Sequence, residues 1–491
     1  MRSYRITLSA LILCFALLTG CAWQTSGVPD ALPAQTPAMP EQTDASAEPK
    51  QNAQTETACA LAYHAAAGTD PYSCTDVCNR LILELIYEPL FAVTAEGEVQ
   101  PVLAEGWSVS DDGLTTSVTV RQGVAFQRGG TLTAADAAAS FAGAAAGSVY
   151  GDRLRHIVRA RAADAFTVEF TTDIPYGCLP LLLDFPIRHA GASAPDGTGP
   201  YRFAEDRLTA FSACWHGNLP LASDTVPLVP VQSAEALRDG FQYGGVSLAL
   251  TDGLSYAGDF DRRAVPTTVL QYLGFRLDGG VFADASVRSA VCRAIDRDAV
   301  VKAFPGGCAV PAVLASVPGS RWYPQELAEK QSCDPSLLSA ALPWGAEATL
   351  LVNADSLSRT AAAEQIAAML RDCGLRVTVQ ALPTAAFTDA LRAGEFDLYY
   401  AETRLGPDQS LAAFFTEGSA LCFGGLSEQT EAARLCELTA ADYGNAYELH
   451  EEILRGGLIC PIAFRTQLLC SRWGALTEYS PYLDWNFLTI Q

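Results

Sequence analysis

Basic residues and histidines are scarce in this chain of 491 residues. It carries 32 Lys and Arg against 55 Asp and Glu, which gives a formal net charge of −23 at pH 7, and it has only 5 His. Proteins that bind nucleic acids need clustered Lys and Arg to contact the phosphates, so we expect no nucleic-acid partner. The histidines are isolated and none is paired at the spacing of metal ligands, so the sequence predicts no metal site.

The sequence also lacks the short motifs of common enzyme classes. It contains no Gly-x-Ser-x-Gly, His-Glu-x-x-His, P-loop or Rossmann fingerprint. The adjacent carboxylates at 111–112 and 451–452 point to different faces and do not form an acid–base pair. We therefore predict no catalytic residue, no cofactor and no enzymatic activity. A secreted hydrolase with an unfamiliar motif stays open as an alternative.

Cysteine spacing indicates neither a metal site nor a regular disulfide framework. Apart from Cys14 and Cys21, thirteen cysteines lie between Cys59 and Cys470, an odd number, and no Cys-x-x-Cys occurs. Export would permit disulfides, but many of these cysteines lie in apolar helical segments, where Cys behaves as a small hydrophobic residue. We expect mostly free, buried thiols.

The first residues show the pattern of an export signal. Arg2 and Arg5 precede an apolar run at 6–18, which is too short to span a bilayer comfortably. The following LTGC at 18–21 resembles the lipobox of bacterial lipoproteins, and this resemblance implies cleavage before Cys21 and lipid attachment to its sulfur. An ordinary secretory signal with an incidental Cys is the alternative. No later apolar run is long enough for a transmembrane helix.

The composition changes abruptly after the signal. Residues 21–58 mix Pro with Gln, Thr, Ser, Ala and Glu, and such a segment cannot bury enough apolar surface to fold. We therefore expect a signal peptide at 1–20, a lipid-anchored disordered tether at 21–58 and a folded body behind them. This layout predicts a protein held outside the cell membrane, at the cell surface or in a periplasm.

The body alternates strand and helix patterns and is long enough for roughly two or three domains. An Asp-Gly turn at 112–113 separates two halves of a predicted hairpin, and Thr133 with Asp136 resembles a capping box. Residues 348–380 predict a strand, a helix and a second, parallel strand, and Thr384 is expected to cap the next helix. The predicted strands are 59–64, 165–170, 348–353, 375–380, 396–401 and 459–469, and the predicted helices are 79–90, 133–147, 358–373, 384–394 and parts of 428–455.

Charged residues follow the predicted strand at 396–401. Glu402, Arg404 and Asp408 come after its apolar run, and a Gly-Pro pair at 406–407 breaks the chain. Ligand-contacting residues in open α/β sheets lie just past the carboxyl ends of strands, so these three are candidate ligand-binding residues. Two alternatives stay open: an ordinary polar turn after a buried strand, and an ion pair between Glu402 and Arg404.

Several short motifs occur in one fixed order along the body. They are YEPLF at 87–91, PxLAEGW at 101–107, DG at 112–113, RxGVxF at 121–126, LTAxD at 132–136, GTGPY at 197–201, VRxA at 287–290 and AIDR at 294–297. This order resembles the extracellular solute-binding proteins of peptide-type ABC importers, the oligopeptide, dipeptide and nickel binding family. The resemblance covers essentially everything after the tether.

The resemblance implies an α/β, two-lobed, periplasmic-binding-protein-like fold of the large, three-subdomain type, with a hinge and a ligand cleft. The implied ranges are 59–91, 195–262 and 461–491 for the first lobe, 92–194 for its β-rich subdomain, and 263–460 for the second lobe. Two crossings between the lobes, near 266–271 and 460–461, suit hinge closure around a ligand.

The resemblance also suggests site residues and a function. In peptide-binding members an Asp soon after this strand holds the ligand's amino group, and Asp408 is the match. Arg404 could bind a carboxylate or phosphate group of a ligand. Tyr201 and Trp322 are candidate aromatic walls of the cleft, with a core role as the alternative. Arg465 is a further candidate ligand-binding residue. The implied function is a monomeric, lipid-anchored receptor that delivers a peptide or other small polar solute to an ABC permease. A sensor or signalling lipoprotein on the same fold is the alternative.

Overall fold

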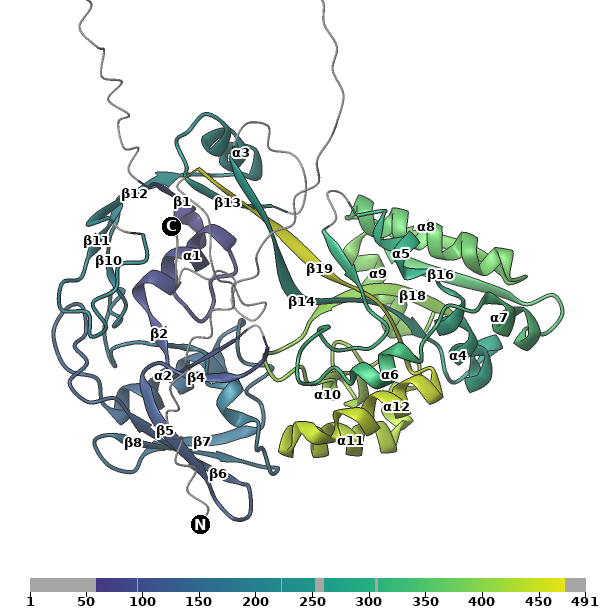
Figure 1. Ribbon diagram of the computed structural model, residues 1–491, viewed down its shortest axis with the longest axis horizontal. Coiled ribbons are helices and arrows are strands. Elements are labelled where there is room, and N and C mark those ends of the chain that lie inside the picture. The colour runs from purple at the N-terminus through teal and green to yellow at the C-terminus, as the bar shows by residue number, and fades with distance from the viewer. Residues whose placement is uncertain (1–58, 95, 222, 252–259, 305–307, 473–491) are drawn as a thin grey trace, which may run out of the picture. The chain divides into compact units, whose positions relative to one another are not determined.

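The computed structural model describes residues 59–94, 96–221, 223–251, 260–304 and 308–472 (Figure 1). The predicted signal peptide, the tether with Cys21 and the predicted lobe segment at 473–491 lie outside the described residues. All elements below belong to the unit that begins at Ala58.

A mixed sheet near the start of the body has the strand order β1-β12-β11-β10. Its strands are β1 (Leu61–Tyr63), β12 (Thr225–Pro230), β11 (Arg207–Ala210) and β10 (Tyr201–Ala204), and β1 runs parallel to β12. Helix α1 (Val77–Ile86) buries Leu81, Ile82 and Leu85 in the same core cluster as Leu61 and Tyr201. The helical pattern was assigned to 79–90 with Pro89 as its stop, and the helix ends earlier than this stop. It stops at Ile86 because Glu88–Pro89 forms strand β2 with β9 (Pro186–Ile187), and Pro89 has no N–H for a helical bond.

A β-rich part follows, and its antiparallel sheet has the order β5-β6-β8-β7. The strands are β5 (Ala104–Val109), β6 (Thr115–Val120), β8 (Thr167–Thr172) and β7 (Ile157–Ala162), with β3 (Phe91–Val93) and β4 (Val99–Pro101) paired beside them. Gly113 has φ +74°, so the predicted hairpin turn is confirmed. Helix α2 (Ala134–Ala146) covers the core cluster of this part. Its capping box is also confirmed: the Thr133 backbone N–H donates to Asp136 Oδ2 at 2.9 Å.

The second half of the body is organised on a sheet of order β13-β19-β14-β18-β16-β17, with β15 paired to β19. The strands are β13 (Leu248–Thr251), β19 (Ile459–Ser471), β14 (Asp261–Phe275), β18 (Leu398–Arg404), β16 (Glu347–Asn353), β17 (Arg376–Leu382) and β15 (Ala309–Pro311). The predicted parallel pair β16–β17 around α8 (Leu357–Asp372) is confirmed. β18 runs parallel to β16 but antiparallel to β14, so the sheet is mixed.

Helices cover both faces of this sheet. Leu398 and Tyr400 of β18 pack in one core cluster with residues of α8 and α4 (Ala285–Ala294), whereas Tyr399 packs in another with α9 (Thr384–Ala393) and α11 (Thr430–Ala441). Because both faces are covered, β18 begins as a continuous apolar run. The other helices are α3 (Ala234–Gln242), α5 (Arg297–Val301), α6 (Gln325–Glu329), α7 (Pro335–Ala341), α10 (Ala412–Phe415) and α12 (Ala446–Gly456).

The start of α9 differs from the prediction. Pro383 is the N-cap residue, and Thr384 is the first residue of the helix. Pro383 precedes the helix in an extended conformation, and the Thr384 hydroxyl is engaged outside the helix, where it accepts a hydrogen bond from Asn353 Nδ2 at 2.7 Å. Thr384 therefore joins α9 to the end of β16 and does not cap the helix.

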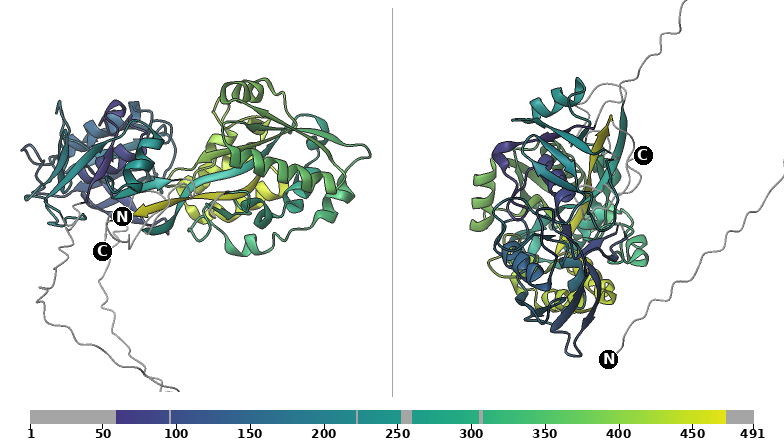
Figure 2. Two further views of the ribbon diagram at one scale, coloured as in Figure 1. Left: turned by 90° about the horizontal axis from the view of Figure 1, so that it is seen from above. Right: turned by 90° about the vertical axis from the view of Figure 1, so that its left-hand side faces the viewer.

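Two long strands connect the halves of the body. β14 and β19 pair antiparallel along most of their length (Figure 2). Towards Ser471, β19 pairs with β13, and Val265 and Leu469 pack in the core cluster of Leu61 and Tyr201. Towards Phe275, β14 pairs with β18 and packs in the core cluster of α8 and α4. The pairing register shifts between Pro266 and Leu270. Such an irregularity bends a strand and interrupts its ladder.

Candidate functional site

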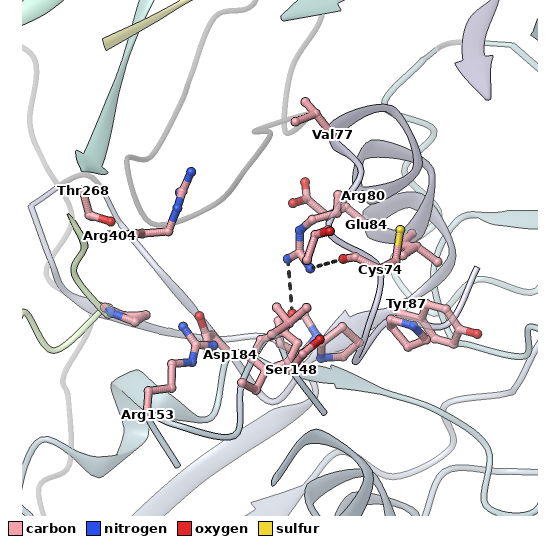
Figure 3. A pocket seen from close by; sticks show the side chains of 18 of the residues that line it. Cys74, Val77, Arg80, Glu84, Tyr87, Ser148, Arg153, Asp184, Thr268 and Arg404 are labelled. Carbon is pink, nitrogen blue, oxygen red and sulfur yellow. Dashed lines mark hydrogen bonds and ion pairs between the residues drawn. The ribbon is translucent and has the colours of Figure 1, made fainter. Parts of the chain in front are cut away.

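A cavity of about 390 Å³ lies between α1 and the end of β18 (Figure 3). Small-molecule sites in proteins usually measure about 300–1,000 Å³, so the cavity has room for a small solute. Its lining residues are Pro71, Cys74, Thr75, Val77, Arg80, Leu83, Glu84, Tyr87, Pro89, Ser148, Val149, Tyr150, Arg153, Asp184, Pro186, Thr268, Arg404, Leu405 and Pro407.

The wall on the α1 side carries Arg80 and Glu84, one helical turn apart and therefore on the same face of α1. Arg80 Nη2 lies 3.3 Å from the Tyr150 hydroxyl, and Arg80 Nη1 lies 3.5 Å from the Cys74 carbonyl oxygen. These contacts orient the guanidinium beside the cavity. Burial raises the pKa of Tyr150, so its hydroxyl keeps its proton at neutral pH.

A buried ion pair closes the side near Tyr150. Arg153 pairs with Asp184, whose side chain is 5% exposed, and the Arg153 guanidinium carbon lies 4.7 Å from the Tyr150 ring centroid. Burial raises the pKa of Asp184, and the charge of Arg153 partly offsets this rise. Removing one partner of such a pair leaves an uncompensated buried charge, so this pair fixes the shape of the wall.

The opposite wall is the end of β18. Thr268 of β14 binds Leu405 twice: its hydroxyl donates to the Leu405 carbonyl oxygen at 2.7 Å, and its own carbonyl oxygen accepts from the Leu405 N–H at 3.0 Å. This clamp fixes the chain direction after Arg404, an exposed residue that lies across the cavity from α1 in Figure 3. Arginine side chains suit carboxylate and phosphate groups because the guanidinium donates in a planar fork.

Glu402 lies in a charge cluster one step back along β18. Its two carboxylate oxygens each lie 3.4 Å from an arginine, Oε1 from Arg359 of α8 and Oε2 from Arg465 of β19. Gln271 Nε2 donates to Glu402 Oε2 at 3.0 Å, and Tyr400 donates to the Oε1 atom of Gln271. The ion pairs of Glu402 thus go to Arg359 and Arg465, and not to Arg404 as the alternative had it.

Asp408 is buried outside the cavity lining. Its Oδ2 accepts a hydrogen bond of 2.6 Å from the Tyr176 hydroxyl, and its Oδ1 accepts one of 3.3 Å from the Ser410 backbone N–H. The next residue, Gln409, has φ +48°, and its side-chain oxygen accepts from the Val317 N–H at 2.7 Å. The loop after β18 is therefore fixed by contacts with other segments of the protein.

The two candidate aromatic residues lie in cores. Tyr201 is fully buried, and its hydroxyl donates to the Ser223 carbonyl oxygen at 2.9 Å. Trp322 is 2% exposed and packs in the core cluster of the β-rich part, against Gly97. Neither side chain lines the cavity, and each lies in a core cluster, as the core alternative describes.

The structure thus separates the predicted site residues. Arg404 lines the cavity, Glu402 and Arg465 form one cluster with Arg359, and Asp408 binds Tyr176. The sequence analysis missed the residues of the other wall, above all Arg80, Glu84, Arg153 and Asp184. Arg80 and Glu84 carried a usable signal, because both are charged residues in a mostly apolar predicted helix at a spacing of four residues. Arg153 and Asp184 lie in segments without a recognisable pattern.

Two features are absent from the residues that the structure describes. Among them, no group of three His, Cys, Asp or Glu side chains is arranged to hold a metal ion. Within the same ranges, no helix has the length and apolar character needed to span a membrane. None of the thirteen cysteines from Cys59 to Cys470, all of them among the described residues, forms a disulfide bond, and most are buried, in agreement with the prediction.

The fold is that of the solute-binding proteins of ABC importers. NikA from Brucella suis in complex with Fe(III)-EDTA superposes with a TM-score of 0.72 over 88% of this chain and 99% of its own, at 18% identity. A putative peptide-binding protein, AppA from Clostridium difficile, gives 0.71 over 87% and 98%, at 16% identity. A nickel ABC transporter protein from Bacillus halodurans gives 0.70 over 85% and 96%, at 19% identity.

The sequence then places the chain within that class. Residues 98–420 match the model of the bacterial extracellular solute-binding proteins, family 5, and the chain belongs to this family. The expected family and the α/β periplasmic-binding fold are therefore confirmed. Members of the family are binding proteins and not enzymes, in agreement with the expectation for this chain.

Curated relatives match over part of their length. The glutathione-binding protein GsiB of Salmonella paratyphi A is 29% identical over 283 residues, which are 52% of this chain and 55% of that protein. GsiB of Escherichia coli O157:H7 is 28% identical over the same shares. The match thus spans about half the length of these relatives.

Proposed function

We propose that the chain is an extracytoplasmic receptor that captures a small solute in the cavity between α1 and the end of β18 and delivers it to the permease of an ABC importer. The cavity itself carries the proposal. It has room for a small solute, its walls come from segments far apart in the sequence, and it lies in a chain of a solute-binding family. β14 and β19, which connect the two halves, are the hinge of this proposal.

The ligand is a peptide or another small polar solute with a negatively charged group. The cavity lining holds three arginines, Arg80, Arg153 and Arg404, against the carboxylates of Glu84 and Asp184. This excess of positive side chains contrasts with the chain's net charge of −23. Arg404 receives the ligand's carboxylate or phosphate, and Glu84 is placed to attract an amino group on the same ligand.

The remaining predicted residues act around this contact. Glu402 and Arg465 hold the end of β18, where Arg404 is attached, and they position it without touching the solute. The lobes comprise 59–91, 195–262 and 461–491 with the subdomain 92–194 on one side, and 263–460 on the other. The receptor works as a monomer.

A thermal-shift screen tests solute capture. Tripeptides, glutathione, nickel–histidine and sugars would be added to the protein without its first 58 residues, and a ligand that binds only the folded state raises the melting temperature. We expect at least one negatively charged solute to stabilise the wild type and to lose this effect in Arg404→Ala. Arg434→Ala, on an exposed face of α11, is the matched control. Silence across all classes would count against the proposal.

The same proposal includes anchoring to the membrane by lipid on Cys21. Expression of the full chain in a bacterium with lipoprotein processing should place it in the membrane fraction, with acyl groups on Cys21 by mass spectrometry. Cys21→Ser should abolish acylation and release the protein from the membrane after processing. A wild-type protein recovered without acyl groups would contradict the anchoring.

A further inference from the structure

Tyr176 and Asp408 form a buried hydrogen bond between segments 232 residues apart in the sequence. Tyr176 follows β8 of the β-rich part, and Asp408 follows β18 of the other half. The Tyr176 hydroxyl lies 2.6 Å from Asp408 Oδ2, and the two residues are 3% and 7% exposed. Hydrogen bonds to a charged carboxylate are short and strong compared with neutral ones.

The bond lies within a close contact between the two halves. Next to Tyr176, Gly177 approaches the chain so closely that an added Cβ would lie 2.1 Å from the Ala441 carbonyl oxygen. The Cys178 backbone N–H then donates to the Ala440 carbonyl oxygen at 3.1 Å. Residues 176–178 therefore dock against the end of α11 and against Asp408, and we call this contact the interlobe latch.

A second contact supports the latch. Trp322, which belongs to the same half as Asp408, inserts its ring into the core cluster of the β-rich part and packs on Gly97. Beside it, Arg321 lies 3.4 Å from Glu98. The β-rich part thus touches the other half through polar and apolar groups, in addition to the covalent connection through β14 and β19.

Asp408 has protein partners on both carboxylate oxygens. Tyr176 binds Oδ2, the Ser410 N–H binds Oδ1, and the cavity is lined by Arg404, Leu405 and Pro407 of the same loop but not by Asp408. Burial and the neighbouring charge of Asp408 raise the pKa of Tyr176, so the phenol stays protonated and remains a donor. Both carboxylate oxygens therefore accept hydrogen bonds from protein groups, and Asp408 does not line the cavity.

We propose that Asp408 and Tyr176 set the closure of the receptor and that Asp408 does not bind the solute. The latch forms between protein groups alone, so it stabilises the closed arrangement of the two halves whichever solute is bound. Recognition of the solute then falls to the cavity, and a free amino group is not required. The inference rests on the proposed solute-binding function, but the latch itself consists of protein groups only.

A double-mutant cycle on the ligand-free protein tests the latch. Tyr176→Phe removes the donor, and Asp408→Asn removes the charge of the acceptor. We expect each to increase the unfolding constant by about 10-fold, and the double variant to equal the single ones within about threefold, since both break one bond. We also expect both single variants to have a larger radius of gyration by small-angle X-ray scattering.

Tyr72→Phe is the matched control. It removes another buried phenol, whose hydroxyl donates to the Pro186 carbonyl oxygen at 3.0 Å within one half of the body. Its effect on unfolding should multiply with that of Asp408→Asn, and its radius of gyration should equal that of the wild type. Independent, multiplying effects of Tyr176→Phe and Asp408→Asn, with unchanged radii, would overturn the proposal.

A binding arm tests the role of Asp408 directly, with trialanine and N-acetyl-trialanine as probes. We expect Asp408→Asn to leave the ratio of the two affinities within about threefold of the wild-type ratio. A selective loss of trialanine of 100-fold or more would overturn the proposal. If no solute of any class binds, the proposed function is contradicted. The scattering experiment and the double-mutant cycle still test whether the latch exists, because neither needs a solute.

Discussion

The Glu402 cluster makes a quantitative prediction about stability. Glu402→Gln removes the charge that Arg359 and Arg465 share, while Gln keeps an oxygen that can accept from Gln271. Exposed ion pairs contribute about 0.2–1 kcal/mol, and hydrogen bonds to buried charges contribute about 1.5–3 kcal/mol. The side chains of Glu402 and Arg465 are each 22% exposed, so we assign about 1 kcal/mol to each of the two pairs.

The substitution also takes away the carboxylate that Arg359 and Arg465 share, while both arginines keep their charge. We therefore expect Glu402→Gln to lower the free energy of unfolding by about 2–3 kcal/mol. Urea unfolding at pH 7, followed by circular dichroism, would show this as a lower midpoint with an unchanged slope. The ligand-free protein is the right sample, because the cluster is predicted to hold β18 without any solute.

Glu431→Gln is the matched control for this experiment. Glu431 pairs with Arg434 at 2.7 Å, but both side chains are more than half exposed, so the control should keep a urea midpoint close to that of the wild type. Equal midpoints for the two variants would refute the reasoning. If Glu402→Gln instead keeps wild-type stability and weakens solute binding, Glu402 contacts the solute and does not act by positioning β18.

Three further predictions concern other parts of the chain. Burial lowers the pKa of His450 to about 4, whereas the pKa of His in an unfolded chain is about 6.5. Between these two pH values only the unfolded state binds the proton. The free energy of unfolding should therefore fall by up to about 3 kcal/mol when the pH is lowered from above 6.5 to 4. His450→Gln should flatten that part of the urea-midpoint profile, and an unchanged profile would exclude His450 as its source. Gly177→Ala places a Cβ against the Ala441 carbonyl oxygen and should enlarge the radius of gyration. The control Gly106→Ala should not, because no atom lies within 4 Å of its added Cβ. Equal radii for the two variants would contradict the close contact. Ile366→Ala in α8 leaves a cavity at a fully buried core position and should lower the free energy of unfolding in urea by about 2–5 kcal/mol. A decrease below about 1 kcal/mol would mean that this core is loosely packed.

Local patterns in the sequence were sufficient for much of the fold. The capping box at Thr133, the hairpin turn at Gly113 and the parallel pair around α8 depend on neighbouring residues, and each was predicted correctly. The errors occurred where a distant segment decides the outcome. Helix α1 ends early because β9, a hundred residues further on, supplies a strand partner for Glu88–Pro89.

The motifs that identified the family mark structural contacts more than the candidate site. Glu88 of YEPLF is buried and accepts hydrogen bonds from the Thr198 hydroxyl at 2.7 Å and from Trp215 Nε1 at 2.8 Å. Arg288 of VRxA donates to the carbonyl oxygens of Phe282 and Gly456 at 2.7 and 3.0 Å. Such residues specify how segments meet, so they predict the fold well and the ligand poorly.

The sequence predicted only one wall of the candidate site, the end of β18. Arg404 was found because it follows a recognisable strand, but its distance from Asp408 and the partners of Glu402 depend on side chains from other elements. Nothing in the local pattern around Asp408 indicates that Tyr176 occupies its carboxylate. Side-chain pairing across the two halves is a property of the folded chain, and the sequence alone offered no signal for it.

The most direct test of the proposed receptor is a crystal structure of the protein with a solute found by the thermal-shift screen. The proposal predicts electron density for the solute between α1 and residues 404–407, with a negatively charged group in hydrogen-bond distance of Arg404 and with Tyr176 still bound to Asp408. Density for the solute elsewhere in the molecule, or a solute amino group on Asp408 in place of Tyr176, would contradict it.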